Sequence, residues 1–194
     1  MRTILALIFV FLVLQAFRIK THYPAATPAV SSGKGVSVAQ KTKPKMHQKK
    51  YVMQYIERYK AVAIHEAQKY NIPVAITLGQ AILESDAGQS RLAKRENNHF
   101  GMKWSGRGKY GIYADDSPTD KFEKFKSVWW SYRYHSHLLA KTSRYKHLTK
   151  LPRTDYKKWA YGLKKAGYAT EPKYALILIS IIERYELYKY DKNE

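Results

Sequence analysis

The sequence predicts a mainly α-helical protein with one small β-hairpin. Two segments, 51–66 and 74–83, carry apolar residues at the spacing or density of buried helices. One segment, 110–127, places short aromatic stretches around a turn-rich centre, which is typical of a hairpin. The length of 194 residues leaves room for one ordinary domain with extensions.

The N-terminus has the pattern of an export signal. Arg2 precedes an apolar run within residues 4–17, and Arg18 and Lys20 follow it. A positive start and a short apolar run are typical of a secretory signal, whereas a full membrane span needs about 20 apolar residues. We therefore predict that residues 1–20 are a signal peptide or a membrane anchor. The protein is expected in the periplasm, the cell envelope or the extracellular space.

Residues 21–48 are predicted to form a flexible basic linker, because they are rich in Pro, Gly and small polar residues and lack apolar periodicity. Residues 1–50 contain nine Lys or Arg and no acidic residue, and the whole chain has a net charge of +20 at pH 7. Such a charge favours polyanionic partners, namely nucleic acid, anionic lipid or acidic envelope polymers. The export signal and the lack of a recognition motif argue against nucleic acid. Contact with a membrane is expected only through the N-terminal segment.

Residues 49–190 are predicted to be the folded domain. A helix with an apolar stripe begins near residue 49 and ends before Pro73, because the residue preceding a proline avoids helical geometry. A second helix, 74–83, is apolar almost all round and should be central and buried. Gly88 is expected to end it, and residues 89–95 to add a short helix.

The second half of the domain continues with loops, a hairpin and three helices. Ser127 is expected to cap a helix that buries Trp129, and Asp155 to cap a helix that buries Trp159 and ends at Gly167. Thr170 and Pro172 are expected to open the last helix.

Glu84 is the residue that we expect to carry chemistry. It stands at the end of the apolar helix, where packing has no need for an acid. A carboxyl that loses hydration in a cleft has a raised pKa and stays protonated near neutral pH. A general acid that protonates a leaving oxygen needs this property. An ordinary exposed Glu near a helix end is the alternative interpretation.

Three separated blocks, within residues 80–88, 98–103 and 167–175, closely resemble glycoside hydrolase family 73, in the right order and at plausible spacings. These enzymes are endo-β-N-acetylglucosaminidases that cut bacterial peptidoglycan. The resemblance implies a mainly α, lysozyme-like α+β fold in which the hairpin forms one wall of a substrate groove. It also implies that Glu84 is the catalytic acid, that Tyr168 lies near the cleavage point, and that Asn98 and Phe100 line the groove.

The family places a second acid on the hairpin, and the resemblance favours Asp116 over Asp115 for this role. Inverting and substrate-assisted mechanisms both fit such an arrangement. Trp104, Tyr168 and Tyr174 are further candidates for sugar-binding faces. No metal site is predicted, because the histidines lack a ligand spacing, and no cofactor is implied. The chain has no cysteine, which excludes a thiol nucleophile.

The leading hypothesis is an exported peptidoglycan hydrolase that cleaves the bond between N-acetylglucosamine and N-acetylmuramic acid. Its expected partners are glycan strands and acidic envelope polymers. A lytic transglycosylase or muramidase would use a similar helix-end Glu on the other glycosidic bond. A non-catalytic cell-wall-binding module is the alternative outside the enzymes.

Overall fold

A computed structural model describes residues 46–106, 110–112 and 121–192. The predicted export signal and nearly all of the predicted linker, 21–48, lie outside these residues, as do Asp115 and Asp116. The helices are α1 (Met46–Tyr70), α2 (Val74–Ser85), α3 (Arg91–Glu96), α4 (Val128–Lys141), α5 (Tyr156–Lys165) and α6 (Tyr174–Arg184), with 3-10 turns η1 (Lys146–Lys150) and η2 (Leu187–Asp191). Two short strands, β1 (Tyr110–Ile112) and β2 (Lys121–Glu123), complete the elements.

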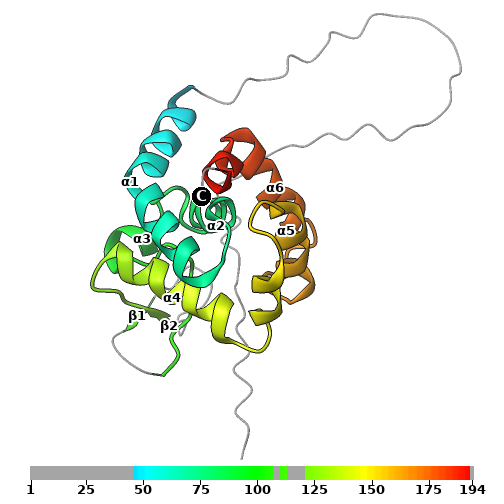
Figure 1. The fold of residues 1–194 in the computed structure, drawn as a ribbon. Helices are drawn as coiled ribbons and strands as arrows, with labels where there is room; N and C mark the ends of the chain where they lie inside the picture. The colour runs from blue at the N-terminus through cyan, green and yellow to red at the C-terminus, as the bar shows by residue number, and fades with distance from the viewer. Residues whose placement is uncertain (1–45, 107–109, 113–120, 193–194) are drawn as a thin grey trace, which may run out of the picture.

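Helix α2 is the centre of the fold. Figure 1 shows it between α1 and α4 on one side and α5 and α6 on the other, and it packs directly on α1, α6 and η2. Nine of its first ten positions from Val74 are apolar or small, and all positions from 74 to 82 are buried because neighbours cover the helix on every side there. Gly79 permits the close approach of α6, since a Cβ there would lie 2.9 Å from Leu178. The predicted buried central helix is confirmed.

The hairpin is confirmed as well. Strands β1 and β2 are antiparallel, with Tyr110 opposite Glu123 and Ile112 opposite Lys121. Lys103 forms an isolated bridge to Phe122, which ties the preceding loop to β2. The hairpin therefore stands as a small lobe beside the helices (Figure 1).

The C-terminal segment is bound to the start of α2. The Asp191 carboxylate accepts hydrogen bonds from the backbone N–H groups of Val74 (2.7 Å) and Ala75 (3.0 Å). These groups have no partner within the helix, and a carboxylate there also opposes the positive end of the helix dipole. Leu187 and Asp191, which follow α6, are thus buried against the central helix.

Several boundaries differ from the prediction. Ser127 occupies the N-cap position of α4 without a side-chain hydrogen bond, whereas Asp155 caps α5 as expected by accepting from the Lys158 N–H. Helix α6 begins at Tyr174, after rather than at Thr170 and Pro172.

The prediction that Trp129 is buried is wrong. It is 39% exposed, and its neighbour Trp130 is 49% exposed, whereas Trp159 is fully buried as expected. In α4 the buried positions are 131, 132, 135, 136 and 139, so residue 129 falls at the edge of the inward face.

Within the described part of the chain, no helix is both long enough and apolar enough to cross a membrane.

Candidate active site

Helix α2 carries Glu84 at its penultimate position and ends immediately after it. Asp86, rather than the expected Gly88, is the first residue in the left-handed region, with φ of 50°, and Ala87 and Gly88 continue it. Asp tolerates this conformation better than most residues, which allows the left-handed turn to begin two residues before Gly88. The Ser85 hydroxyl accepts from the Gly88 N–H at 2.8 Å and fixes the turn. Glu84 is therefore fixed between the last turn of α2, which precedes it, and the left-handed turn at 86–88, which follows it.

The Glu84 carboxyl is in a site that favours its neutral form. The residue keeps partial exposure, but Oε1 is buried and has no hydrogen-bond partner among the described residues. Burial raises the pKa of Glu84 from 4.5 to about 8. Desolvation has this effect because the charged form loses more hydration than the neutral form. The side chain is thus a carboxylic acid at neutral pH.

Tyr168 and Tyr174 lie near this acid, one in the loop after α5 and one at the start of α6. Burial raises the pKa of both phenols well above the usual value, and the nearby Glu84 charge adds to the effect. Their ring centroids are 5.7 Å apart, and both residues are at most 1% exposed. The Tyr168 hydroxyl has no partner among the described residues. Because both rings are buried near the Glu84 carboxyl, they have no free face on which a sugar could stack.

A buried polar network beneath the site joins three helices. His135 Nε2 lies 3.0 Å from Gln80 Oε1, and Gln80 Nε2 donates to the Tyr174 hydroxyl at 2.7 Å. Burial lowers the pKa of His135 to about 3, so its ring is neutral and its Nε2 is the donor. Gln80 was not among the predicted site residues. Gln80 precedes Glu84 by four residues and so lies on the same face of an apolar helix. This spacing could have identified Gln80 as a site residue from the sequence.

The loop after α3 is fixed by Asn98 and Phe100. Asn98 Nδ2 donates to the carbonyls of Met102 (2.9 Å) and Glu123 (3.0 Å), and Asn98 Oδ1 accepts from the Met102 N–H (3.0 Å). Phe100 stacks on His135 with ring centroids 4.0 Å apart. Both predicted groove residues are almost fully buried. They position the loop against β2 and α4 and leave little surface of their own for a substrate.

The hairpin lobe supplies Trp104 and Glu123. Trp104 is partly exposed, and Lys121 Nζ lies 5.1 Å from its ring centroid. Glu123 is engaged in structure, since its Oε1 accepts from the Ser105 N–H and hydroxyl, each at 2.8 Å. Asp115 and Asp116, the expected second acids, lie outside the described residues.

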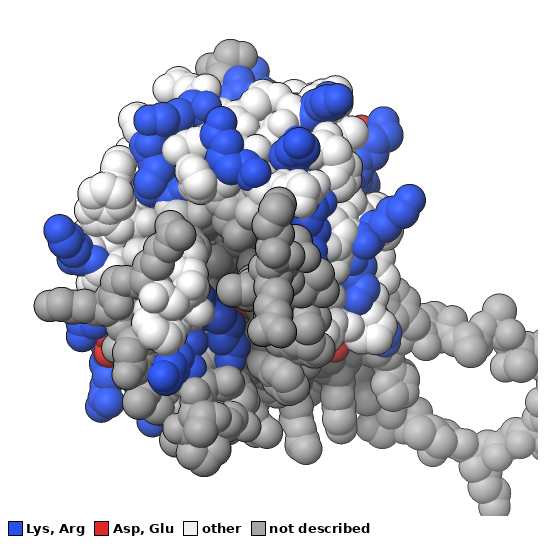
Figure 2. Space-filling model, turned by 90° about the horizontal axis from the view of Figure 1, so that it is seen from below, with Lys and Arg blue, Asp and Glu red and all other residues white. Residues whose placement is uncertain are grey.

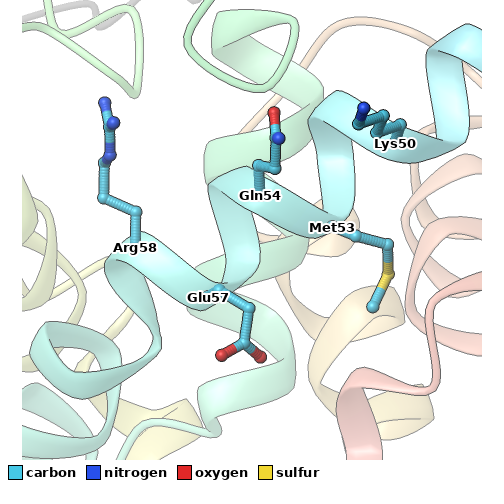
Figure 3. A pocket seen from close by; sticks show the side chains of 5 residues that line it. All are labelled: Lys50, Met53, Gln54, Glu57 and Arg58. Carbon is cyan, nitrogen blue, oxygen red and sulfur yellow. The ribbon is translucent and has the colours of Figure 1, made fainter.

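Two hollows lie along α1, away from the side chain of Glu84. One, of about 590 Å³, is lined by Lys50, Met53, Gln54, Glu57 and Arg58, and Figure 3 shows these side chains projecting from two sides of the helix. The other, of about 470 Å³, is lined by residues of α1, the turn after α2, α3 and the start of α4. Glu84 lines neither hollow, so its assignment as the site rests on chemistry and not on cavity size.

Comparisons with known proteins identify the family of the chain. Residues 60–187 match the glucosaminidase family model, described as mannosyl-glycoprotein endo-beta-N-acetylglucosaminidase. The exo-glucosaminidase LytG of Bacillus subtilis is 35% identical over 136 residues, which are 64% of this chain and 48% of that protein. The chain therefore spans about half the length of this curated relative.

Solved structures show the same fold. An N-acetylmuramoyl-L-alanine amidase structure from Staphylococcus aureus aligns with a TM-score of 0.64 and 31% identity, over 75% of this chain and 44% of that one. The glycoside hydrolase domain of Salmonella typhimurium FlgJ aligns with a TM-score of 0.57 and 28% identity, over 70% of this chain and 88% of that one. The expected mainly helical, lysozyme-like architecture is confirmed.

Proposed function

The chain belongs to the glucosaminidase family, glycoside hydrolase family 73, and from this premise we propose that it hydrolyses the β-1,4 bond between N-acetylglucosamine and N-acetylmuramic acid in peptidoglycan. The observation that carries the proposal is the Glu84 carboxyl at the end of the central helix, where Oε1 is buried without a described partner and burial raises the pKa to about 8. A glycosidase needs an acid that is neutral at working pH and fixed in place.

Glu84 acts as the general acid. It donates its proton to the glycosidic oxygen while the bond from that oxygen to C1 of N-acetylglucosamine breaks. Water then adds to C1, and the carboxylate of Glu84 regains a proton afterwards. General acid catalysis of this kind contributes typically about 10²–10⁴-fold to a rate.

Tyr168 is proposed to contact the substrate at the cleavage point through its hydroxyl. Buried polar atoms without a partner are rare, and Tyr168 Oη and Glu84 Oε1 are both of this kind among the described residues. Substrate oxygens would satisfy both. The raised pKa of Tyr168 keeps the phenol neutral, so that it donates a hydrogen bond.

The second acid is proposed to be Asp116, with Asp115 as the alternative. In an inverting course it accepts a proton from the attacking water, and in a substrate-assisted course it stabilises the N-acetyl group as nucleophile. Asn98, Phe100 and Tyr174 are proposed to shape the groove, and Trp104 to offer a sugar-binding face from the hairpin lobe.

The substrate lies outside the cytoplasm, which agrees with the proposed role of residues 1–20 as a signal peptide or membrane anchor. In this proposal residues 21–48 link that segment to a catalytic domain of residues 49–190. Acidic polymers of the envelope are proposed as further partners of the basic chain.

Mass spectrometry of digested peptidoglycan tests which bond is cut. Purified peptidoglycan is incubated with the protein, the new ends are reduced, and the fragments are identified. Reduced N-acetylglucosamine at the new ends supports the proposal. Reduced N-acetylmuramic acid would indicate a muramidase, and anhydro-N-acetylmuramic acid a lytic transglycosylase. Fragment lengths over time separate cleavage within strands from cleavage at strand ends.

A further inference from the structure

Trp129 and Trp130 form an exposed indole pair at the start of α4, outside the site around Glu84. They are 39% and 49% exposed, and their ring centroids are 4.9 Å apart in an edge-to-face arrangement. Single exposed apolar side chains are ordinary, but adjacent exposed tryptophans are not, since indole is among the most costly side chains to leave in water. The catalytic proposal gives this pair no role.

The pair is held in a fixed position by an ion pair with a buried acid. The guanidinium of Arg133 lies over the Trp129 ring, 4.8 Å from its centroid. Arg133 is bonded to the carboxylate of Glu66, with Arg133 Nη2 at 2.7 Å and Nε at 3.0 Å from Glu66 Oε1. Glu66 is fully buried, so this ion pair is little weakened by solvent. Trp129 therefore has little freedom, and Trp130 packs against it. A rigid exposed aromatic loses little entropy on binding.

No unpaired acid is described next to the pair, and the nearest free charge is positive. Arg133 neutralises Glu66, and Lys126 is exposed just before the helix. Figure 2 shows Lys and Arg side chains over much of another face, with few acidic groups visible, and the whole chain has a net charge of +20. A ligand that fits must offer flat apolar faces and carry negative charge. The C–H faces of a pyranose ring stack on indole, and the stem peptides of peptidoglycan carry carboxylates.

We propose that Trp129 and Trp130 form a second glycan-binding site, which holds a part of the peptidoglycan away from the bond being cut. The proposal rests on the proposed function for the identity of the polymer. The ring contacts of the pair involve α4 and the His65 side chain of α1, whereas Glu84 lies near Tyr168 in the loop after α5 and Tyr174 at the start of α6. A second attachment point would keep the protein on an insoluble substrate between cleavage events. It raises the effective concentration of the catalytic site near the next glycosidic bond to be cut.

Binding to purified peptidoglycan tests this site in a Glu84→Gln background, where the wall stays intact. Trp130→Ala is compared with Tyr161→Ala, which removes an equally exposed aromatic (54%) from α5. We expect Trp130→Ala to weaken co-sedimentation affinity about tenfold, the size typical of removing a central aromatic anchor. Tyr161→Ala should bind like its parent, and Trp130→Tyr should recover most of the affinity. Equal thermal melts show that the variants are folded.

Nuclear magnetic resonance gives a second readout that does not depend on the insoluble wall. Titration of the Glu84→Gln protein with a short soluble glycan of alternating N-acetylglucosamine and N-acetylmuramic acid should shift the indole N–H signals of Trp129 and Trp130, and Trp130→Ala with Glu84 intact should still cleave such glycans at the parental rate. Unchanged wall binding by Trp130→Ala, or an equal loss in Tyr161→Ala, would overturn the proposal. If the protein binds peptidoglycan through the tryptophan pair but releases no new reducing ends, the second binding site is supported and the proposed hydrolase activity is contradicted.

Discussion

At the scale of single residues, the proposed chemistry depends on the protonation state of Glu84. A carboxyl with an ordinary pKa is ionised at neutral pH and has no proton to donate. Burial at the end of α2 raises the pKa of Glu84 to about 8, and the adjacent phenols of Tyr168 and Tyr174 add no charge. The free energy that keeps the proton on the acid is the cost of placing an ionised carboxylate where Oε1 has no described partner.

This raised pKa predicts how the stability of the protein depends on pH. The unfolded chain loses the Glu84 proton near pH 4.5, whereas the folded protein keeps it until about pH 8. The stability that Glu84 contributes is therefore full below pH 4.5 and is lost as the pH rises to 8. Glu84→Gln should match the wild type at pH 4 and exceed it at pH 9 by about 2–4 kcal/mol, an amount reduced for partial exposure.

Urea denaturation at the two pH values measures the difference. Glu183→Gln, which removes a half-exposed carboxylate from α6, is the control and should show no such gain at pH 9. An equal response of the two variants to pH would mean that Glu84 is not held neutral.

The roles of single residues were only partly predictable from the sequence. Glu84 was identifiable because its acid interrupts an apolar helix, and that contrast is visible in the letters alone. The exposure of Trp129 could not be predicted, because aromatic residues at helical spacing are compatible with a buried face as well as with an exposed one. The Gln80 to Tyr174 contact joins residues 94 positions apart, and no local pattern encodes it.

At the scale of elements, the packing of α2 fixes the position of Glu84. The middle of α2 packs on α6 at Gly79, and its N-terminus is bound by Asp191 from the end of the chain. Helices 51–66 and 74–83 and the hairpin were predictable, since apolar periodicity and turn residues are local signals. The Asp191 contact was not, because a capping residue 117 positions from Val74 leaves no mark near the helix.

Asp191→Ala should destabilise the protein more than loss of an ordinary cap does. It leaves the N–H groups of Val74 and Ala75 without acceptors at a buried helix end, which costs about 2–3 kcal/mol. Asp155→Ala removes the exposed cap of α5 and is the matched control, with an expected cost of about 1 kcal/mol. Thermal and urea unfolding give both values. Equal losses of stability in the two variants would show that the contact of Asp191 with the start of α2 contributes no more than an exposed helix cap does.

At the scale of the whole molecule, charge and family membership point to the same kind of substrate. The net charge of +20 favours polyanions, and peptidoglycan carries the carboxylates of its stem peptides. Basic side chains spread over the face in Figure 2 rather than gathering in one place. We infer that charge supports general attachment to the wall, while Glu84 and its neighbours determine which bond is cut.

Ionic strength should therefore separate attachment from catalysis. Raising NaCl from about 50 to about 500 mM shortens the Debye length from about 13 Å to about 4 Å and screens contacts between exposed charges. Co-sedimentation of the Glu84→Gln protein with peptidoglycan should weaken markedly over this range. Wild-type hydrolysis of a short soluble glycan that contains the bond between N-acetylglucosamine and N-acetylmuramic acid should change much less. Wall binding that is insensitive to salt would contradict a role for the basic surface.

The most direct test of the account compares the wild type and Glu84→Gln on one preparation of purified peptidoglycan. The quantity measured is the release of new reducing ends over time, with Glu183→Gln as the folded control. If Glu84 is the general acid, the wild type and the control release ends that carry N-acetylglucosamine, and Glu84→Gln loses at least about 10²-fold of the rate. Comparable release by Glu84→Gln would show that another residue supplies the proton and would contradict the central claim.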